Sequence, residues 1–382
     1  MPMQPKQAMI IGAGPGGLTA AIALRRVGFE PIVFERAAAL REIGSGLTLW
    51  PNALRALAWL DLDEPIRSIS RSSGGMTMRT WRGDALFDMS AATLEQHFGG
   101  AGVALHRAEL QALLLETLGA ERVQLDHSCI GYQQDETGVT ALFERGLTAR
   151  GAILVGADGI KSRIRSQLIG ASALKYAGCT VWRGIAEYPL HSCVGQTSMG
   201  PGSQFGFFPM TRDRVYWFGS ANAAEGAPDQ PGGRKRELIR RFQDWHAPIR
   251  ALIEATDEAV ILRNDIYDHD PLSRWSDGCV TLLGDAAHPI TPNMGQGACL
   301  AIEDAVVLAR CLEAAPNSRA ALQAYQAQRM QRTASITLQS RRMGQIGQWR
   351  HPLVCWLRNQ MIKRTPAGMR VRQLESMFQF EP

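Results

Sequence analysis

A glycine cluster near the start of the sequence constrains the fold more than any other feature. The cluster, GAGPGG at residues 12–17, follows the apolar run AMII and precedes a helix-like run, LTAAIALRRVG, and a second apolar run, PIVFER. This order predicts strand, tight turn, helix and strand, which together form a βαβ unit. Units of this kind build doubly wound α/β domains around a mostly parallel sheet.

The spacing G-x-G-x-x-G, in this setting, is typical of a turn that binds a dinucleotide. Gly12 permits the tight turn, Gly14 lets the backbone approach a pyrophosphate, and Gly17 lets helix and strand pack closely. Glu35 ends the second apolar run, where a carboxylate can accept hydrogen bonds from a ribose diol. A plain glycine turn with a solvated Glu35 is the alternative, and the complete βαβ setting argues against it.

Two later apolar runs also end in acidic residues. ARGAILVGADG contains Asp158 near its end, and DGCVTLLGDAA contains Asp285, so both predict buried parallel strands with polar carboxyl ends. The loop at 284–297, GDAAHPITPNMGQG, then opens a helix whose glycines expose backbone N–H groups. Such a loop suits the ribityl chain and ring of a flavin dinucleotide better than a nicotinamide dinucleotide, and an ordinary glycine-rich helix start is the simpler alternative.

The composition is that of a globular chain. Of the 382 residues, 45% are hydrophobic and 20% charged, which excludes bulk disorder, and a net charge of +5 is too mild to indicate nucleic acid as a partner. Seven cysteines without a C-x-x-C pair predict neither a metal site nor a disulfide scaffold, and the cytoplasm is the expected compartment. Since no signal peptide or long apolar span is visible, we expect no integral membrane segment.

The middle and end of the chain have different patterns. Aromatic and small residues alternate over 177–220, which predicts an antiparallel sheet with one working face, and the chain reads as helical from Gly297 onward. The basic C-terminal segment is interpreted as a packed or solvated helix rather than a membrane-surface helix. The predicted units are a discontinuous nucleotide domain (1–73, 98–176 and 272–345), an inserted sheet domain (74–97 and 177–271) and a helical tail (346–382).

Three stretches together resemble the single-component FAD-dependent aromatic hydroxylases, the group A flavoprotein monooxygenases. They are GAGPGG with the later Glu35, ADGIKSRIR at 157–165, and GDAAHPITPNMGQG, in the order and at the spacing usual for that family. GSGLTLWPNALRALAWLDL, YAGCTVWRGIAE and FFPMTRDRVYWF are most similar to its urate hydroxylase and zeaxanthin epoxidase branch. The resemblance implies a Rossmann-like FAD/NAD(P)-binding domain, an inserted antiparallel β-sheet substrate domain and C-terminal helices, as in para-hydroxybenzoate hydroxylase.

The resemblance also implies which residues contact the cofactor. Pyrophosphate contacts are expected at Gly12, Gly14, Gly16 and Gly17, adenosine contacts at Glu35 and Arg36, and further cofactor contacts at Thr48, Arg107, Asp158 and Gly159. Contacts with the ribityl chain and the isoalloxazine are expected at Gly284, Asp285, Pro292, Gly295, Gln296, Gly297 and Ala298. From the residues alone, Arg107 could instead pair with Glu109, and Asp158 could cap a helix.

The mechanism that the resemblance implies uses NADH or NADPH as a transient donor, because a second G-x-G-x-x-G in strand-turn-helix context is missing. NAD(P)H would reduce a tightly bound FAD, O2 would form a C4a-hydroperoxyflavin, and one oxygen atom would pass to a small aromatic substrate. The protein would orient the substrate and exclude water, with no metal and no covalent nucleophile.

Three residues of the alternating region are candidates for substrate binding. Arg183 could clamp an anion or form a structural ion pair, and Tyr216 could orient the substrate by a hydrogen bond. Gln204 stands where the resemblance places an arginine in urate-oxidising relatives, so urate itself is in doubt. His288 could relay a proton, but a loop histidine with satisfied hydrogen bonds is the simpler interpretation.

Four other functions remain open at this point: an epoxidase of an electron-rich alkene on the same fold, a flavin-dependent halogenase, a dehydrogenase that uses the first βαβ unit alone, and a non-catalytic flavin-binding interaction protein. The W-x-W-x-I-P stretch expected of a halogenase is not visible. A homodimer is also compatible with the sequence.

Overall fold

A six-stranded sheet carries the predicted βαβ unit. The computed structural model describes residues 6–40, 45–170 and 172–382. The order of strands in this sheet is β18 (Ser276–Asp277), β19 (Val280–Leu282), β12 (Ile153–Gly156), β1 (Lys6–Ile11), β2 (Phe29–Phe34) and β8 (Val123–Gln124). All neighbours are parallel except β18 and β19. The three apolar runs that precede the expected cofactor residues therefore end along one edge of this sheet, which confirms the predicted fold class.

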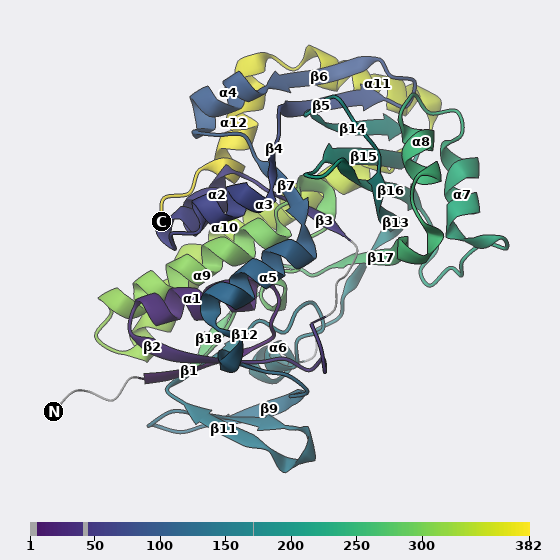
Figure 1. The fold of residues 1–382 in the computed structure, drawn as a ribbon. Coiled ribbons are helices and arrows are strands. Elements are labelled where there is room, and N and C mark those ends of the chain that lie inside the picture. Colours follow the sequence, from purple (N-terminus) through teal and green to yellow (C-terminus); the bar gives the residue numbers. More distant parts are fainter. Residues whose placement is uncertain (1–5, 41–44, 171) are drawn as a thin grey trace.

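Helices cover this sheet and connect it to the rest of the molecule (Figure 1). α1 (Pro15–Arg26) follows β1 and packs against α9 (Gly297–Ala314) and α5 (Arg107–Leu118). Gly16 lies at the contact between α1 and α9, because a Cβ atom there would be 2.9 Å from the Cβ atom of Ala301. Two helix N-termini from distant parts of the chain are thereby brought next to each other.

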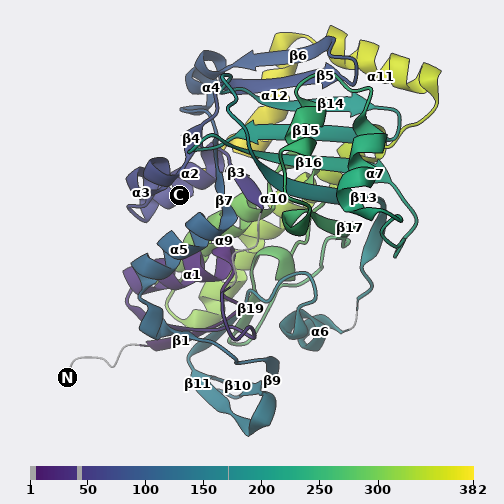
Figure 2. The ribbon, with the colours of Figure 1, turned by 45° about the vertical axis from the view of Figure 1, so that its right-hand side comes forward.

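A second, seven-stranded sheet forms the other half of the molecule (Figure 2). Its order is β17 (Leu262–Asp268), β13 (Lys175–Glu187), β16 (Arg214–Asn222), β15 (Ser203–Pro209), β14 (Gly195–Gly200), β5 (Gly75–Thr80) and β6 (Ala85–Ser90). The strands of the alternating stretch 177–220 pair antiparallel, as expected, and β5 joins β14 in parallel. The hairpin of β5 and β6 comes from an earlier part of the chain. It extends the sheet beyond β14, so that β6 forms one edge.

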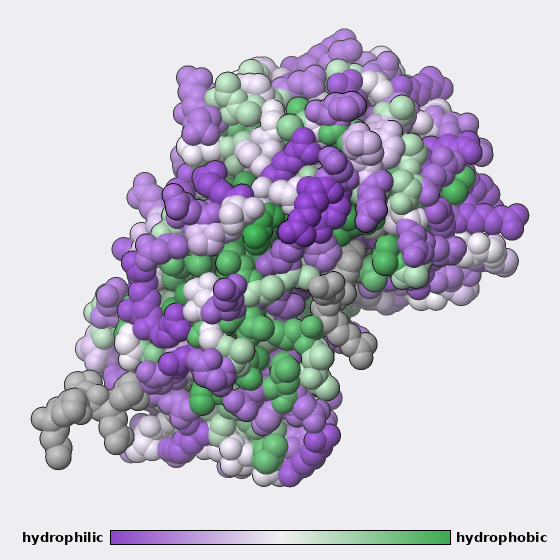
Figure 3. Space-filling model, viewed as in Figure 1, coloured by the Kyte–Doolittle hydropathy of each residue, from purple (hydrophilic) through white to green (hydrophobic). Residues whose placement is uncertain are grey.

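Helices cover one face of this second sheet, and the other face is available for a functional site. Trp182, Phe205 and Trp217 are buried in a cluster with residues of α7 (Gly233–Phe242) and α8 (Ile249–Glu254). Side chains alternate along each strand, so their neighbours face the opposite way, toward the parallel sheet. On the side seen in Figure 1, apolar residues gather over the middle of the molecule, between the two sheets (Figure 3).

The run ARGAILVGADG, expected as one strand, is two strands in two sheets. β11 (Thr148–Gly151) pairs with β10 (Val139–Phe143), which pairs with β9 (Cys129–Gln134), and β12 then joins the parallel sheet. A second three-stranded sheet contains β3 (Gly46–Leu49), β7 (Val103–His106) and β4 (Arg71–Ser72). The strand expectation was wrong because the sequence has no turn signal at Ala152, where the chain changes partners.

The remaining helices lie around these sheets, and the longest, α10 (Ser318–Gly347), contacts α9 and also β13 of the second sheet. The others are α2 (Pro51–Trp59), α3 (Asp63–Ile69), α4 (Ala91–Phe98), α6 (Arg163–Ile169), α11 (Pro352–Arg364) and α12 (Ala367–Phe378). None of the helices in the described residues has the length and apolar character needed to cross a membrane. The proposed domain boundaries remain an interpretation of this layout.

Candidate active site

The turn before α1 leaves open space at the N-terminus of the helix. A Cβ atom at Gly14 would meet no other atom within 4 Å, whereas one at Gly17 would lie 2.0 Å from the carbonyl oxygen of Gly12. Gly12 has a φ of 110°. Within the described residues, no side chain caps α1 and its first turn holds no acidic residue. The fold therefore requires Gly12 and Gly17, and Gly14 borders a space suited to an anion.

Glu35 is held beside this turn by the backbone. Its Oε2 accepts a hydrogen bond from the N–H of Ala13 at 2.9 Å, and its Oε1 accepts one from the N–H of Ala37 at 3.0 Å. Each oxygen keeps a further lone pair that can accept from a hydroxyl group. Arg36 follows Glu35 and is exposed, while Thr48 lies half-buried on β3.

Asp158 caps a helix, the alternative considered for it. Its Oδ1 accepts a hydrogen bond from the Ser162 hydroxyl at 2.5 Å, and its Oδ2 accepts one from the N–H of Arg163 at 2.7 Å, at the start of α6. Gly159 follows Asp158 with a φ of 80°, and a Cβ atom there would also meet nothing within 4 Å.

Arg165 links the Asp158 loop to the Asp285 loop, and sequence reasoning missed it. Its guanidinium is buried and donates to the carbonyl oxygens of Ile160 at 2.5 Å and Ala286 at 3.0 Å. The available signal was its position three residues before the buried Leu168, which places it on the inner face of α6.

The loop at 284–297 is anchored from below by a buried cluster of charges. Oδ2 of Asp304 accepts from the N–H of Gly284 at 3.1 Å and lies 2.5 Å from Nε2 of His288. Arg329 on α10 donates to Asp304 and to Glu303, both at 2.6 Å. His288 therefore has a buried partner at Nε2, but its buried Nδ1 has no hydrogen-bond partner among the described residues, so the interpretation of a fully satisfied loop histidine holds only in part.

Burial raises the pKa of Asp304, but the charges of His288 and Arg329 outweigh burial and lower that pKa to about 2. This cluster is hard to predict from sequence patterns, because charged residues on helices usually form solvated faces.

The end of the same loop begins α9. Gly295 has a φ of 61°, and the buried Gln296 accepts a hydrogen bond from the side chain of Asn52 at 2.9 Å. Within the part of the chain that the structure describes, no side chain caps α9 and its first turn holds no acidic residue. The first N–H groups, around Gly297 and Ala298, are thus suited to a carbonyl or anionic oxygen.

Asp285 and Arg107 lie deep in the molecule and are nevertheless reached by solvent. Burial raises the pKa of Asp285, while the charges of His288, Arg107 and Arg165 lower it. Burial also lowers the pKa of Arg107, and the charge of Asp285 raises it. The alternative pairing of Arg107 is not found, because Glu109 pairs with Arg214 at 2.8 Å.

Arg183 and Tyr216 share the open face of the second sheet. Arg183 is registered opposite Phe218, and the neighbouring pair on the same face is Ile185 and Tyr216. Burial raises the pKa of Tyr216, while the charges of Arg183 and Arg107 lower it, so these groups are electrostatic neighbours. The structure therefore brings Arg183 and Tyr216 to the side where Arg107 and Asp285 lie.

Gln204 lies farther along the same face. It is registered opposite Ser220, four positions from Tyr216 on β16. Its amide contacts α10, since a Cβ atom at Gly347 would lie 1.6 Å from Nε2 of Gln204. Gln204 thus forms the end of the face that α10 covers.

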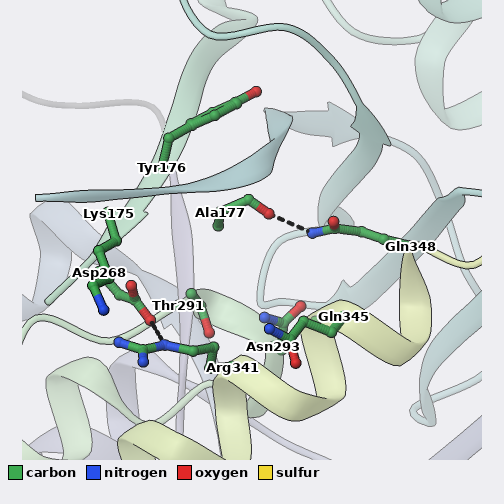
Figure 4. Close-up of a pocket in the computed structure, with 10 residues that line it drawn as sticks. Lys175, Tyr176, Ala177, Asp268, Thr291, Asn293, Arg341, Gln345 and Gln348 are labelled. Carbon is green, nitrogen blue, oxygen red and sulfur yellow. Dashed lines mark hydrogen bonds and ion pairs between the residues drawn. The ribbon is translucent and has the colours of Figure 1, made fainter. Parts of the chain in front are cut away.

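A cavity of about 260 Å³ lies between the start of β13, the loop around Thr291 and the end of α10. Figure 4 shows Arg341 and Gln345 of α10, and Gln348 just after its end, on the opposite side of the cavity from β13. The Gln348 amide donates to the carbonyl oxygen of Ala177 at 2.8 Å, and Arg341 donates to Asp268 at 2.6 Å. Sequence reasoning missed these polar residues because their spacing on α10 shows no apolar pattern.

The N-termini of α1 and α9 lie at the edge of one parallel sheet, and the exposed Asp285 lies in the loop that leads to α9, an arrangement that suits a flavin dinucleotide. The comparisons agree: the chain belongs to the family described as FAD binding domain, whose model matches residues 6–340.

Two curated relatives and one solved structure show the relationship over most of the chain. The aurachin C monooxygenase/isomerase of Stigmatella aurantiaca is 38% identical over 376 residues, 98% of each chain. The FAD-dependent urate hydroxylase of Klebsiella pneumoniae is 33% identical over 88% of this chain and 89% of its own. The crystal structure of Klebsiella pneumoniae HpxO with FAD and uric acid has a TM-score of 0.92 at 30% identity, covering 98% of this chain and 96% of that one. This chain is therefore an FAD-dependent monooxygenase of the aromatic hydroxylase class.

Replacing Asp285 by alanine is expected to weaken FAD binding by about tenfold to a hundredfold, because a charged hydrogen-bond acceptor contributes about 1.5–3 kcal/mol. The ratio of flavin to protein absorbance after gel filtration measures the retained cofactor. Asp277→Ala removes an exposed acid from the neighbouring strand β18 and serves as the control. Normal flavin retention in Asp285→Ala would contradict a ribityl contact.

Proposed function

We propose that this monooxygenase uses NAD(P)H and O2 to hydroxylate a flat aromatic or heteroaromatic molecule that carries an anionic or hydrogen-bonding ring oxygen. The observation that carries the proposal is the placement of Arg183 and Tyr216 on one sheet face, as electrostatic neighbours of Arg107. Arg107, an expected cofactor contact, is in turn an electrostatic neighbour of Asp285, and this supports a cofactor beside the same sheet face.

The residues present fit an FAD. The N-terminus of α1 beside Gly14 would hold the pyrophosphate, Glu35 a ribose, Asp285 the ribityl chain, and the N-terminus of α9 the carbonyl edge of the ring. When bound and reduced by NAD(P)H, this group supplies the activation of O2. The chain itself must bind the substrate, orient it and keep water out.

Arg183 and Tyr216 would polarise the substrate. Because burial raises the pKa of Tyr216, its hydroxyl stays protonated near neutral pH and can donate a hydrogen bond to a ring oxygen. The guanidinium of Arg183 would stabilise negative charge on that oxygen, which increases the electron density of the ring and favours attack by an electrophilic oxygen.

The shape of the face suits a flat ring. The rings of Phe208 and Tyr216 are 6.4 Å apart at 24°, and those of Phe208 and Phe218 are 6.5 Å apart at 22°. Glycines make room for them, since a Cβ atom at Gly46 would lie 2.4 Å from the ring of Tyr216. The neutral Gln204 at the end of the face disfavours urate and favours a less polar heteroaromatic substrate.

A substrate panel tests this function. Purified protein with FAD is mixed with phenols, indoles, quinolones and purines, and both NAD(P)H consumption and product mass are measured. A compound that accelerates NAD(P)H oxidation and gains one oxygen atom supports the proposal, and the position of that oxygen distinguishes a hydroxylase from an epoxidase. If no compound in the panel accelerates NAD(P)H oxidation, the proposed function is wrong and a non-catalytic flavin-binding role is favoured.

Replacing Arg183 by alanine is expected to lower kcat/KM for anionic substrates at least about tenfold more than for neutral ones, because the charge-assisted hydrogen bond is lost. Steady-state kinetics with a matched pair of compounds, one ionised and one neutral at the assay pH, provides the measurement. An equal loss for both compounds would show that Arg183 has a structural role instead.

The seven cysteines are free, as is usual in a reducing compartment, and this supports our proposal that the protein works in the cytoplasm.

A further inference from the structure

An exposed apolar surface lies at the C-terminal end of the chain. Eight large hydrophobic residues there are exposed, out of thirteen in the described residues: Met343, Ile346, Trp349, Leu353, Trp356, Leu357, Met361 and Met369. We call these eight residues the C-terminal apolar surface. Trp356 is 54% exposed and Met361 is 69% exposed, which is unusual for such large apolar side chains in one region.

The helix α11 carries four of these residues on its outer side. Leu353, Trp356, Leu357 and Met361 have the spacing i, i+3, i+4 and i+8, which places them on one helix face. The opposite side holds the buried Cys355 and Arg358, and Arg358 donates to the carbonyl oxygen of Gly200 at the end of β14. Figures 1 and 2 both show α11 at the outer edge of the molecule, so this face points to solvent.

The same segment has a strong positive charge. No acidic residue occurs between Glu313 and Glu375, whereas eleven Lys and Arg residues occur there. Because the whole chain has a net charge of +5, the rest of the chain has six more acidic than basic residues. Five of the eleven are exposed at or beyond the end of α10: Arg342, Arg350, Lys363, Arg364 and Arg372.

We propose that the C-terminal apolar surface docks on an anionic lipid bilayer. A helix with Trp and Leu on one face and flanking Lys and Arg lies in the interface of a membrane, with its apolar side inserted and its charges at the headgroups. A second copy of this chain complements the surface less well, because it would bring two basic segments together. Only the anionic bilayer matches both the apolar face and the charge.

The cavity beside α10 lies close in sequence to the C-terminal apolar surface. Gln345 and Gln348 line the cavity, and each directly precedes a residue of that surface, Ile346 and Trp349. The proposed docking does not depend on the proposed function.

Vesicle co-sedimentation tests the docking with FAD-loaded protein. The probes are vesicles of phosphatidylcholine alone and vesicles with about 30% phosphatidylglycerol, and each basic residue near the surface adds an attraction that salt weakens. We expect at least about tenfold stronger partition onto the anionic vesicles, and less at high salt. Equal partition onto both kinds of vesicle, or onto neither, would overturn the proposal.

Matched double variants locate the binding surface. Trp356→Ser with Leu357→Ser should reduce partition at least about tenfold, because two large side chains no longer insert. The control, Ile130→Ser with Leu147→Ser, changes residues of 56% and 48% exposure on another sheet, against 54% and 48% for the test pair. It should bind vesicles normally, and an equal loss in the control would overturn the assignment to α11.

Charge variants test the contribution of the basic residues to vesicle binding. Lys363→Glu with Arg364→Glu should weaken partition at least about tenfold, whereas Arg236→Glu with Arg240→Glu, at exposed positions of α7, should not. Light scattering of the same proteins checks for self-association. A dimer that Trp356→Ser with Leu357→Ser dissociates, in a protein that does not bind vesicles, would assign the surface to a second copy instead. None of these measurements uses a substrate, so the result is independent of the proposed function.

Discussion

Gly14→Val is expected to weaken FAD binding at least about a hundredfold, or about 2.7 kcal/mol, while the chain still folds. The added side chain would meet no protein atom within 4 Å, and Gly14 has a φ of −72° that valine tolerates. It would instead occupy the space through which a pyrophosphate approaches the N-terminus of α1. Titration of the apoprotein with FAD, followed by flavin fluorescence, measures the dissociation constant, and circular dichroism monitors the fold.

Two other glycines provide the comparison. Gly368→Val adds the same side chain in open space on α12, far from α1, and should leave FAD affinity unchanged. Gly17→Val should prevent folding, because its Cβ atom would lie 2.0 Å from the carbonyl oxygen of Gly12. If folded Gly14→Val bound FAD with the affinity of the unchanged protein, the pyrophosphate would have to lie elsewhere.

Arg329→Met is expected to lower the free energy of unfolding by about 3 kcal/mol, because it leaves two buried carboxylates with too few partners. Arg329 is 2% exposed, and it donates to Glu303 and Asp304, which are both fully buried. Arg332 and His288 remain as partners, so the loss should stay at the lower end of the range known for broken buried ion pairs. Urea unfolding of the apoprotein gives the value without the contribution of bound FAD.

The pH dependence distinguishes lost charge compensation from lost packing. With Arg329 present, the pKa of Asp304 is lowered to about 2. The stabilisation from its ionised carboxylate is therefore complete at pH values above the usual pKa range of an Asp, and it is lost only in strong acid. In Arg329→Met, burial should raise this pKa, and the difference in stability should shrink between about pH 7 and about pH 5. A pH-independent difference would indicate packing alone, and the exposed Arg319→Met should change stability by less than about 0.5 kcal/mol.

The parallel sheet could be predicted because local signals and the global fold agree there. The glycines at 12–17 lie between two apolar runs, and each later run that ends near Asp158 or Asp285 carries a polar group at its carboxyl end. Parallel strands align these ends at one edge, so residues up to 270 positions apart could be expected in one site. Alternation also placed Trp182 and Arg183 on opposite faces of the second sheet, but only the structure shows that the face of Trp182 is the covered one.

The changes of sheet could not be predicted, since they depend on which partner strands are available. ARGAILVGADG is continuously apolar and small, yet Gly151 pairs in one sheet and Ile153 in another. The hairpin of β9 and β10 did have a signal that was missed, the turn sequence DETG. Asp135 there accepts hydrogen bonds from the N–H groups of Thr137 and Gly138.

The polar parts of the site depend on contacts between distant helices, and a single sequence shows these poorly. Glu303, Asp304 and Arg329 read as ordinary charges on helices, but Asp304 accepts from the N–H of Gly284 in the loop, and Arg329 donates to Asp304. Arg165 and Gln348 likewise act through backbone carbonyls, which carry no residue-specific pattern. Sequence patterns therefore predicted the residues at the strand ends, but not the distant side chains that hold the loops after those strands in place.

The length of the helix α10 affects how the two halves of the molecule can move during turnover. It is 30 residues long, or about 45 Å, and its first half holds the charged cluster under the flavin loop. Its last turns touch both halves of the reaction chamber, because Cβ atoms at Gly344 and Gly347 would collide with Asn293 and Gln204. One helix thus contacts both walls of the chamber, so we expect it to oppose movement of the two sheets relative to each other.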